Sequence, residues 1–271
     1  MAKQKVLYFS QEINPYLPET TMSVSARQIT QGIQEKGFEV RTFMPKYGCI
    51  NERRNQLHEV IRLSGMNLII DETDHPLIIK VATLQPSRMQ VYFIDNEDYF
   101  MRPPLKELEI DISPEDNDER IIFFARGVIE TVKKLRWEPA IIHCSGWVSA
   151  LGPAYLKNIY NEDPSFRNSR IIYSLYGRGF EGTLDERFAV KLRRDGFTDE
   201  QLSLINDSCV DFDTLNKFAI ANSDAVVLAD PEASPALIEY ARSAGKPILE
   251  YNEDLQSAPE RYADLYNSLL Q

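Results

Sequence analysis

The sequence predicts an α/β fold in which a parallel sheet is covered by helices on both faces. Short apolar runs alternate along the chain with longer segments whose apolar residues recur at helical spacing. Parallel strands need such helical crossovers, so this alternation is typical of a three-layer architecture. The 271 residues, 43% of them hydrophobic, are enough for one well-buried core. We see no internal repeat and no Gly/Ser linker, so one domain is favoured over two.

The N-terminal segment has the pattern of a strand, a helix and a second strand. Lys5–Ser10 is a β-rich run, and after a proline-containing loop Met22–Lys36 carries apolar residues at helical spacing. Gly37 stands where a helix C-cap is expected. Glu39–Met44 then resumes strand character until Pro45 stops it. The chain therefore opens with a βαβ unit.

Three β-rich runs follow at close spacing, at Asn67–Ile70, Leu77–Leu84 and Met89–Ile94. Turn-forming residues separate them, including Asp74-His75-Pro76 between the first two. Strands this close in sequence have no room for a helix between them. We expect a strand-rich insert or a sheet edge here.

The remainder of the chain returns to alternating helices and strands. Asp116–Leu135 has acids at its start, lysines at its end and an apolar stripe, which predicts a long helix. Leu184–Arg194 and Asp199–Ile205 also look helical. The other expected elements are strand Ala140–Cys144, helix Trp147–Ile159, strand Arg170–Leu175, helix Thr214–Ala221, strand Ala225–Ala229, helix Ser234–Ala244, strand Pro247–Glu250 and helix Pro259–Leu270.

The charge balance argues against a nucleic-acid partner. Lys and Arg number 30 against 41 Asp and Glu, so the net charge of −11 repels a phosphate backbone. Apolar stretches such as Ile121–Ala125 are far too short to span a bilayer, and the first residues lack a signal-peptide core. We therefore predict no membrane partner and a cytoplasmic location.

The three cysteines fit a reducing compartment. Cys49, Cys144 and Cys209 are odd in number and too far apart for a CxxC zinc or redox motif. No other spacing of metal-binding residue types stands out. The sequence therefore predicts neither a metal nor a cofactor.

Parallel sheets place their ligand sites beyond the carboxyl ends of the strands. This rule directs attention to the loops after Ser10, Met44, Cys144, Leu175 and Ala229. A tempting motif, Gly177-Arg-Gly-Phe-Glu-Gly182, matches G-x-G-x-x-G behind the Leu175 strand. Two helical segments follow it instead of the second strand and acid of a dinucleotide fold. We interpret it as a glycine-rich loop.

Isolated histidines and acidic runs are weak signals of a site. His143 and the cysteine that follows it should point to opposite faces of the sheet, so they form no metal pair. His58 and His75 look like surface residues. The acids of Asp95–Asp98 and Asp116–Glu119 suggest a metal or acid/base site, but they stand at turns and helix starts, which favour carboxylates anyway.

Five blocks of the chain, in order, resemble a known family: Val6–Pro15, Lys36–Gly48, Val91–Phe100, Asp116–Arg126 and Pro139–Leu156. Together they are similar to the N-terminal half of bacterial glycogen and starch synthases of glycosyltransferase family 5. Those GT-B enzymes move glucose from ADP-glucose onto an α-1,4-glucan.

The resemblance implies a Rossmann-like domain over residues 1–271, equivalent to one half of a GT-B enzyme, with the second GT-B domain absent. The family's K-T-G-G-L loop, whose lysine and glycines approach the sugar nucleotide, falls on Pro18–Met22. Its H-x-H-D-W block falls on His143–Trp147, where Ser145 and Gly146 replace the second histidine and the aspartate. A third block, T-I-H-N-L-A-Y-Q-G, falls on Ser174–Gly182.

These departures favour a degenerate, non-catalytic half, a pseudoenzyme that binds α-glucan or a partner transferase. The alternative is a glucosyltransferase that moves glucose from ADP-glucose to an α-1,4-glucan, either by itself or together with a partner chain that supplies the donor domain. A sugar nucleotide and a second copy of the chain are the other candidate partners. No catalytic residue is assigned. The residues expected nearest to a ligand crevice are Glu12, Tyr16, His143, Trp147, Tyr176 and Arg178.

Overall fold

The computed structural model describes residues 3–101, 116–205 and 209–271. Its strands form one sheet in the order β10-β9-β8-β7-β1-β2-β6-β5-β3, with β4 paired to β5. The strands are β1 Lys5–Ser10, β2 Glu39–Pro45, β3 His58–Glu59, β4 Met66–Ile70, β5 Thr73–Leu84, β6 Met89–Asp95, β7 Ile141–Ser145, β8 Arg170–Leu175, β9 Ala225–Leu228 and β10 Ile248–Leu249. The path from β10 to β6 is parallel throughout, as the alternating pattern predicts.

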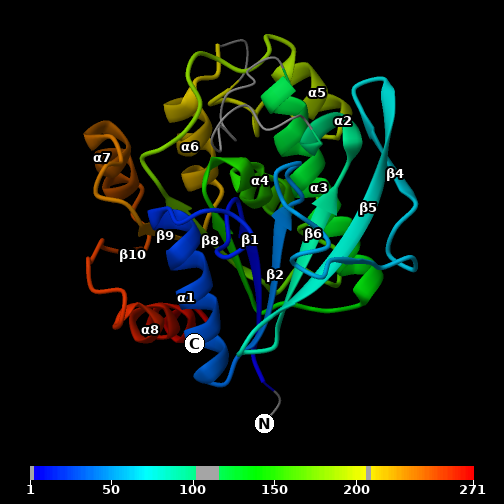
Figure 1. Cartoon of the computed structure of the whole chain (residues 1–271). Coiled ribbons are helices and arrows are strands. Elements are labelled where there is room, and N and C mark those ends of the chain that lie inside the picture. The colour runs from blue at the N-terminus through cyan, green and yellow to red at the C-terminus, as the bar shows by residue number, and fades with distance from the viewer. Residues whose placement is uncertain (1–2, 102–115, 206–208) are drawn as a thin grey trace.

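Helices cover both faces of this sheet (Figure 1). They are α1 Thr21–Glu35, α2 Glu97–Phe100, α3 Asn117–Leu135, α4 Leu151–Asn158, α5 Phe188–Arg194, α6 Phe212–Ala221, α7 Pro235–Ser243 and α8 Ala258–Leu269, with a 3₁₀ turn at Trp147–Ser149. Helices α1 and α8 lie side by side. The long helix expected at Asp116–Leu135 is confirmed as α3.

The register of the central strands shows which of their side chains face the helices on each side of the sheet. In the register of β1 and β7, Tyr8 is opposite His143 and Phe9 is opposite Cys144. The His143 ring contacts Tyr266 of α8, whereas the Phe9 ring packs on α3. His143 and Cys144 therefore point to opposite faces, as expected from strand alternation.

The β-rich insert forms an antiparallel sheet edge, but its strand boundaries differ from the prediction. The expected turn Asp74-His75-Pro76 lies inside β5, which runs from Thr73 to Leu84. Residues 73–77 pair with β4 alone, because pairing with β6 starts at Ile78. A proline lacks the N–H that a second neighbouring strand would need, so Pro76 is tolerated in this one-sided stretch.

Two further expectations need correction. Residues 199–205 form consecutive turns instead of a helix, and the side chains of Thr198 and Gln201 each accept from the other residue's backbone amide. His75 is buried, not on the surface, because its ring lies against the Tyr99 ring of α2, with the ring centroids 4.6 Å apart. His58 is exposed, as expected. Within residues 3–101, 116–205 and 209–271, no helix has the length and apolar character required to cross a bilayer.

Candidate functional site

Two hollows lie beyond the carboxyl ends of the central strands, where ligand sites of parallel sheets occur. One has a volume of about 390 Å³ and the other about 330 Å³. Both are lined by Thr20 and Thr21 at the start of α1, by Tyr176 after β8 and by Tyr251 after β10. We call the two hollows together the crevice.

Three of the six residues expected at a crevice line it. Glu12, Tyr176 and Arg178 all border the smaller hollow. Tyr176 also borders the larger one, and burial raises the pKa of its phenol well above the usual value, so it is a neutral hydroxyl. The ligand-binding role of these three side chains stays a prediction.

Tyr16 and Trp147 belong to the core and line neither hollow. The Tyr16 ring packs edge-on against Phe93 at 4.9 Å, and the Trp147 ring lies 5.0 Å from Phe180. Trp147 is 1% exposed. The strand-end rule identifies the loop that carries such residues, but it does not determine which way a side chain turns.

His143 is likewise a core residue. Its Nδ1 lies 2.7 Å from the Tyr266 hydroxyl and its Nε2 lies 2.5 Å from the Ser174 hydroxyl. The ring stacks on Tyr8 at 4.5 Å and is fully buried. Burial lowers the pKa of His143 to about 3, so the imidazole is neutral and both its nitrogens are occupied.

This burial predicts a pH effect on stability. The pKa of His143 is about 3 in the fold and about 6.5 in the unfolded chain, so the unfolded state binds the extra proton as the pH falls below 6.5. Between pH 6.5 and pH 3, we expect His143 to lower the free energy of unfolding by about 1.4 kcal/mol for each unit by which the pH falls. Urea titrations at pH 7 and pH 5 should show a smaller pH-dependent loss in His143→Gln than in the wild type. Equal losses would contradict the assignment.

The start of α1 is already occupied by the chain's own polar groups. Thr20 caps the helix, because its hydroxyl accepts from the Ser23 amide at 2.9 Å while the Ser23 hydroxyl accepts from the Thr20 amide at 2.9 Å. The Thr20 hydroxyl donates to the Glu12 carboxylate at 2.6 Å. The Glu12 carboxylate therefore lies at the positive end of this helix, bonded to Thr20 of the segment that aligns with K-T-G-G-L.

Gly146, at the position of the family's aspartate, has no room for a side chain. Its backbone has φ +82°, a conformation that favours glycine. A Cβ here would lie 2.7 Å from Oε1 of Gln11 and 2.9 Å from Cε of Met22. Those two side chains fill the space that an aspartate would need.

The glycine-rich loop serves close packing between strand-end loops. The Gly177 amide donates to Asp230 at 3.1 Å, and the other Asp230 oxygen accepts from the Glu232 amide at 3.0 Å. A Cβ on Gly177 would lie 2.4 Å from the Glu232 backbone, and one on Gly179 would lie 2.0 Å from the Phe212 ring. No helix starts directly behind the loop, since α5 begins at Phe188. The interpretation as a loop without a dinucleotide fits this geometry.

Sequence reasoning missed Thr20, Asp230 and Tyr251 as parts of the crevice. Tyr251 follows the predicted strand at Pro247–Glu250, so applying the strand-end rule to that last strand would have found it. Asp230 follows Ala229, which the rule did select. The Thr-x-x-Ser spacing at the start of the helix could have indicated that Thr20 caps it.

The described lining of the crevice is predominantly acidic. Its carboxylates outnumber its guanidinium groups by six to two. The acids are Glu12, Glu19, Asp230, Glu232, Glu250 and Glu253, and the bases are Arg178 and Arg261. This lining disfavours a polyanionic ligand such as a diphosphate.

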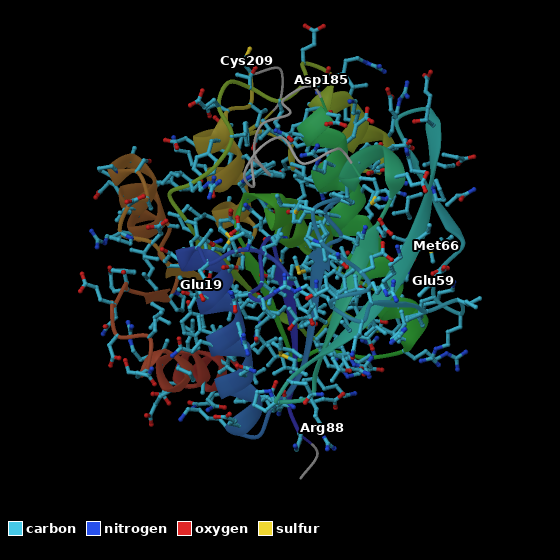
Figure 2. All side chains as sticks on the ribbon, viewed as in Figure 1. Glu19, Glu59, Met66, Arg88, Asp185 and Cys209 are labelled. Atoms are coloured by element: carbon cyan, nitrogen blue, oxygen red, sulfur yellow. The ribbon has the colours of Figure 1, made fainter. Side chains whose placement is uncertain are left out.

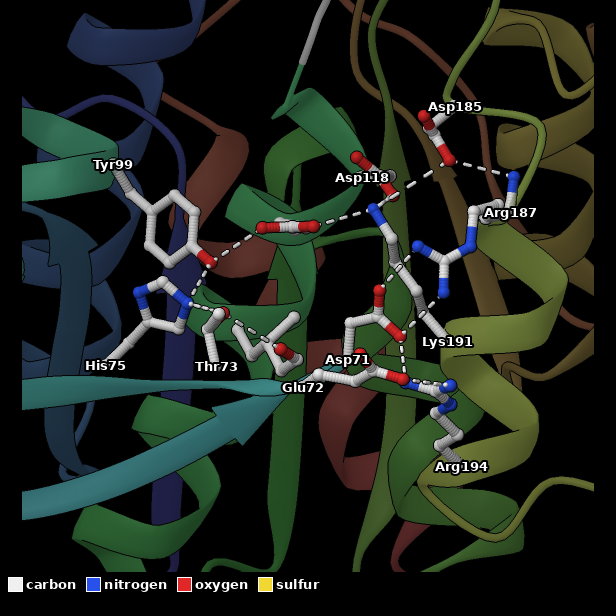
Figure 3. Close-up of polar contacts among 12 residues, drawn as sticks. Asp71, Glu72, Thr73, His75, Tyr99, Asp118, Asp185, Arg187, Lys191 and Arg194 are labelled. Carbon is white, nitrogen blue, oxygen red and sulfur yellow. Dashed lines mark hydrogen bonds and ion pairs between the residues drawn. The ribbon is translucent and has the colours of Figure 1, made fainter.

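A second polar cluster joins α3, α5 and the β4–β5 turn (Figure 3). The Lys191 ammonium of α5 lies 2.6 Å from Asp118 and 2.7 Å from Glu119. Arg187 and Arg194 bind Asp71 in the turn. Burial alone would lower the pKa of Lys191, but its hydrogen bonds and ion pairs with the two acids outweigh this and raise it. The acids at the start of α3 are thus structural ion-pair partners.

The acids of the Asp95–Asp98 run also serve the fold. Asp95 pairs with Lys80 at 2.7 Å, and the Asn96 side chain accepts from the Asp98 amide at 2.9 Å to cap α2. Asp95 is thus an ion-pair partner of Lys80, and the run starts α2, which agrees with the helix-start interpretation.

A parallel sheet with a crevice at its carboxyl edge is the architecture of one GT-B-type glycosyltransferase domain. The chain belongs to the starch synthase catalytic domain family, whose model matches residues 5–241. A structure titled "Catalytic domain of Starch Synthase IV from Arabidopsis thaliana bound to ADP and acarbose" superposes with a TM-score of 0.75 at 19% identity. The match covers 94% of this chain and 53% of that chain.

Curated relatives are named glycogen synthase. That of Chlorobium luteolum is 36% identical over 189 residues, which are 69% of this chain and 39% of the relative. That of Chlorobaculum parvum is 34% identical over 240 residues, 85% of this chain and 48% of the relative. The chain thus spans less than half the length of these two relatives.

Proposed function

We propose that this chain is a non-catalytic synthase half, a single domain over residues 1–271, that binds an α-glucan in the crevice without transferring glucose. The observation that carries the proposal is the segment Pro18–Met22, which has Pro18 and Glu19 where the family's K-T-G-G-L loop carries a lysine. Glycosyl transfer from a sugar nucleotide needs positive charge around the leaving diphosphate. In this loop the chain presents a negative charge instead.

The shape and chemistry of the crevice support a neutral carbohydrate. Hollows of about 390 and 330 Å³ fall within the range of ligand sites, about 300–1,000 Å³. Carboxylates accept hydrogen bonds from sugar hydroxyls, and the half-buried Tyr251 ring offers apolar surface to a sugar face. The Arabidopsis relative was solved with ADP and acarbose. The acidic lining here favours a ligand without a diphosphate.

A direct assay separates the proposal from the glucosyltransferase alternative. The purified chain is mixed with ADP-glucose and glycogen, and both co-sedimentation with glycogen and incorporation of glucose are measured. We expect co-sedimentation without incorporation. Incorporation by the chain alone, or only after a chain with a donor domain is added, would favour the alternative. Absence of co-sedimentation would refute the glucan-binding part.

Replacing Tyr251 with Ala is expected to weaken glycogen binding about three- to tenfold, since the ring at the junction of the hollows is lost. Affinity is measured by co-sedimentation over a range of glycogen concentrations. Tyr240→Ala is the matched control, because Tyr240 is partly exposed on α7 and lines neither hollow. Equal losses in both variants would argue against the crevice as the binding site.

A further inference from the structure

A third hollow, of about 240 Å³, lies at the opposite end of the sheet, beside the amino ends of β1, β2 and β6. We propose that this hollow binds a compact oxyanion, either a free phosphate or the phosphate group of a sugar monophosphate. Lys3, Arg41 and Arg88 line it. Figure 2 shows Arg88 at the end of the molecule that holds the N-terminus, far from Glu19 at the crevice. The site is therefore separate from the proposed glucan site.

The walls of the hollow are anchored to α1. The Gln34 side-chain amide donates to the Ser87 carbonyl at 3.2 Å, and the Gln31 side-chain amide donates to the Ser87 hydroxyl at 3.1 Å. Arg27 binds the carbonyl of Gln85 at 3.3 Å. These contacts hold the β5–β6 turn, and with it Arg88, against the end of the helix.

Two of the three cations have no counter-charge among the residues that the structure describes. The side chains of Lys3 and Arg88 form no ion pair or hydrogen bond with any residue in the described part of the chain. Arg41 lies 4.8 Å over the Trp137 ring and 3.9 Å from Glu39, a distance too long for a hydrogen bond. Glu39 itself accepts from the Trp137 indole at 2.7 Å. Three cations thus face one carboxylate, in a protein whose net charge is −11.

The backbone of Arg88 is strained, and no hydrogen bond or ion pair of its side chain with the described residues offsets this strain. Its φ is +56°, in the left-handed region where a residue with a Cβ is disfavoured relative to glycine. Strained residues cluster at binding sites, where the surrounding structure holds them in place. Here the strained position presents an unpaired guanidinium at the edge of a hollow.

Unsatisfied polar atoms in the lining give a second, independent observation. Nη1 of Arg41 and Oε1 of Gln34 are buried without a hydrogen-bond partner among the described residues. Leaving such groups unpaired is unfavourable, so a ligand that accepts from Arg41 and donates to Gln34 recovers part of the loss. A phosphate or phosphomonoester carries both acceptor oxygens and, when protonated or attached to a sugar, a hydroxyl donor.

Isothermal titration in phosphate-free buffer tests the proposal, with inorganic phosphate and glucose 1-phosphate as probes and glucose as the neutral control. We expect both phosphates to bind, and Arg88→Gly to weaken them about tenfold, the equivalent of about 1.4 kcal/mol. Glycine also relieves the positive φ, so Arg88→Gly should raise the unfolding midpoint while it lowers affinity. Loss of binding is then not a consequence of misfolding.

Arg62→Gln is the matched control, since Arg62 is exposed and lies outside the hollow. Its phosphate affinity should equal that of the wild type. Tighter binding of glucose 1-phosphate would assign the site to a sugar monophosphate, and equal binding would assign it to the free oxyanion. Three results would overturn the proposal: no heat with either phosphate, unchanged affinity in Arg88→Gly, or an equal loss in Arg62→Gln. Glycogen co-sedimentation of Arg88→Gly reports on the crevice separately.

Discussion

Replacing Lys191 with Met is expected to lower the free energy of unfolding by about 3–5 kcal/mol, the cost of leaving a buried charge without its partner. Asp118 is fully buried, and Lys191, itself 6% exposed, lies 2.6 Å from its carboxylate. Methionine keeps the length and apolar stem of lysine but supplies no charge. Chemical denaturation followed by circular dichroism measures the loss.

A double variant separates the charge from the packing. Asp118→Asn in the Lys191→Met background removes the unpaired carboxylate, so part of the lost stability should return. Glu119 also loses its ion pair with Lys191 but keeps the hydrogen bond from Tyr99 at 2.9 Å. The double variant should therefore recover only the stability that was lost at Asp118. A loss below about 1 kcal/mol in Lys191→Met would show that the ion pair is not important to the fold.

Replacing Gly146 with Asp, which restores the family's residue, is expected to destabilise the fold by about 2–5 kcal/mol. The new side chain must adopt φ +82° and displace Gln11 and Met22, whose atoms lie 2.7 and 2.9 Å from the position of its Cβ. Backbone strain and overpacking each cost about 1–3 kcal/mol. Thermal and denaturant unfolding measure the change, and glucose incorporation is expected to stay absent.

Gly37→Asp is the matched control for this variant. Gly37 has a similar backbone, with φ +98°, but nothing lies within 4 Å of where its Cβ would be. It therefore reports backbone strain without collision, and its loss should be about 1–2 kcal/mol. Similar losses in the two variants would mean that the space beside Gly146 is not filled as described.

Much of the fold could be predicted from the sequence because local pattern and tertiary role agree. The stripe of α3 and the apolar strand at Arg170–Leu175 show their periods plainly, and both occur within a residue of the expected bounds. Pro76 misled the prediction because a proline signals a turn unless the strand has only one neighbour, and neighbours are a tertiary property. Residues 199–205 likewise have a helical sequence pattern, but they form turns in the structure.

The crevice could be predicted to the level of loops and not of side chains. The strand-end rule selected the loops that carry Glu12, Tyr176 and Arg178, and these side chains line a hollow. His143 belongs to the same edge, but α8 covers it with Tyr262 and Tyr266. That helix lies more than 100 residues away in sequence, so no local pattern could reveal its packing on His143.

The borders of the sheet bear on how copies of this chain can meet. The outer side of β5 is divided between β3, which has two residues, and β4, which has five, and the opposite border is the two-residue β10. A long row of free backbone amides and carbonyls is the template that lets sheets join edge to edge and aggregate. Within the described residues this sheet offers no such row. Self-association through the described residues would therefore rely on side-chain surfaces, which can be selective in a way that backbone pairing is not.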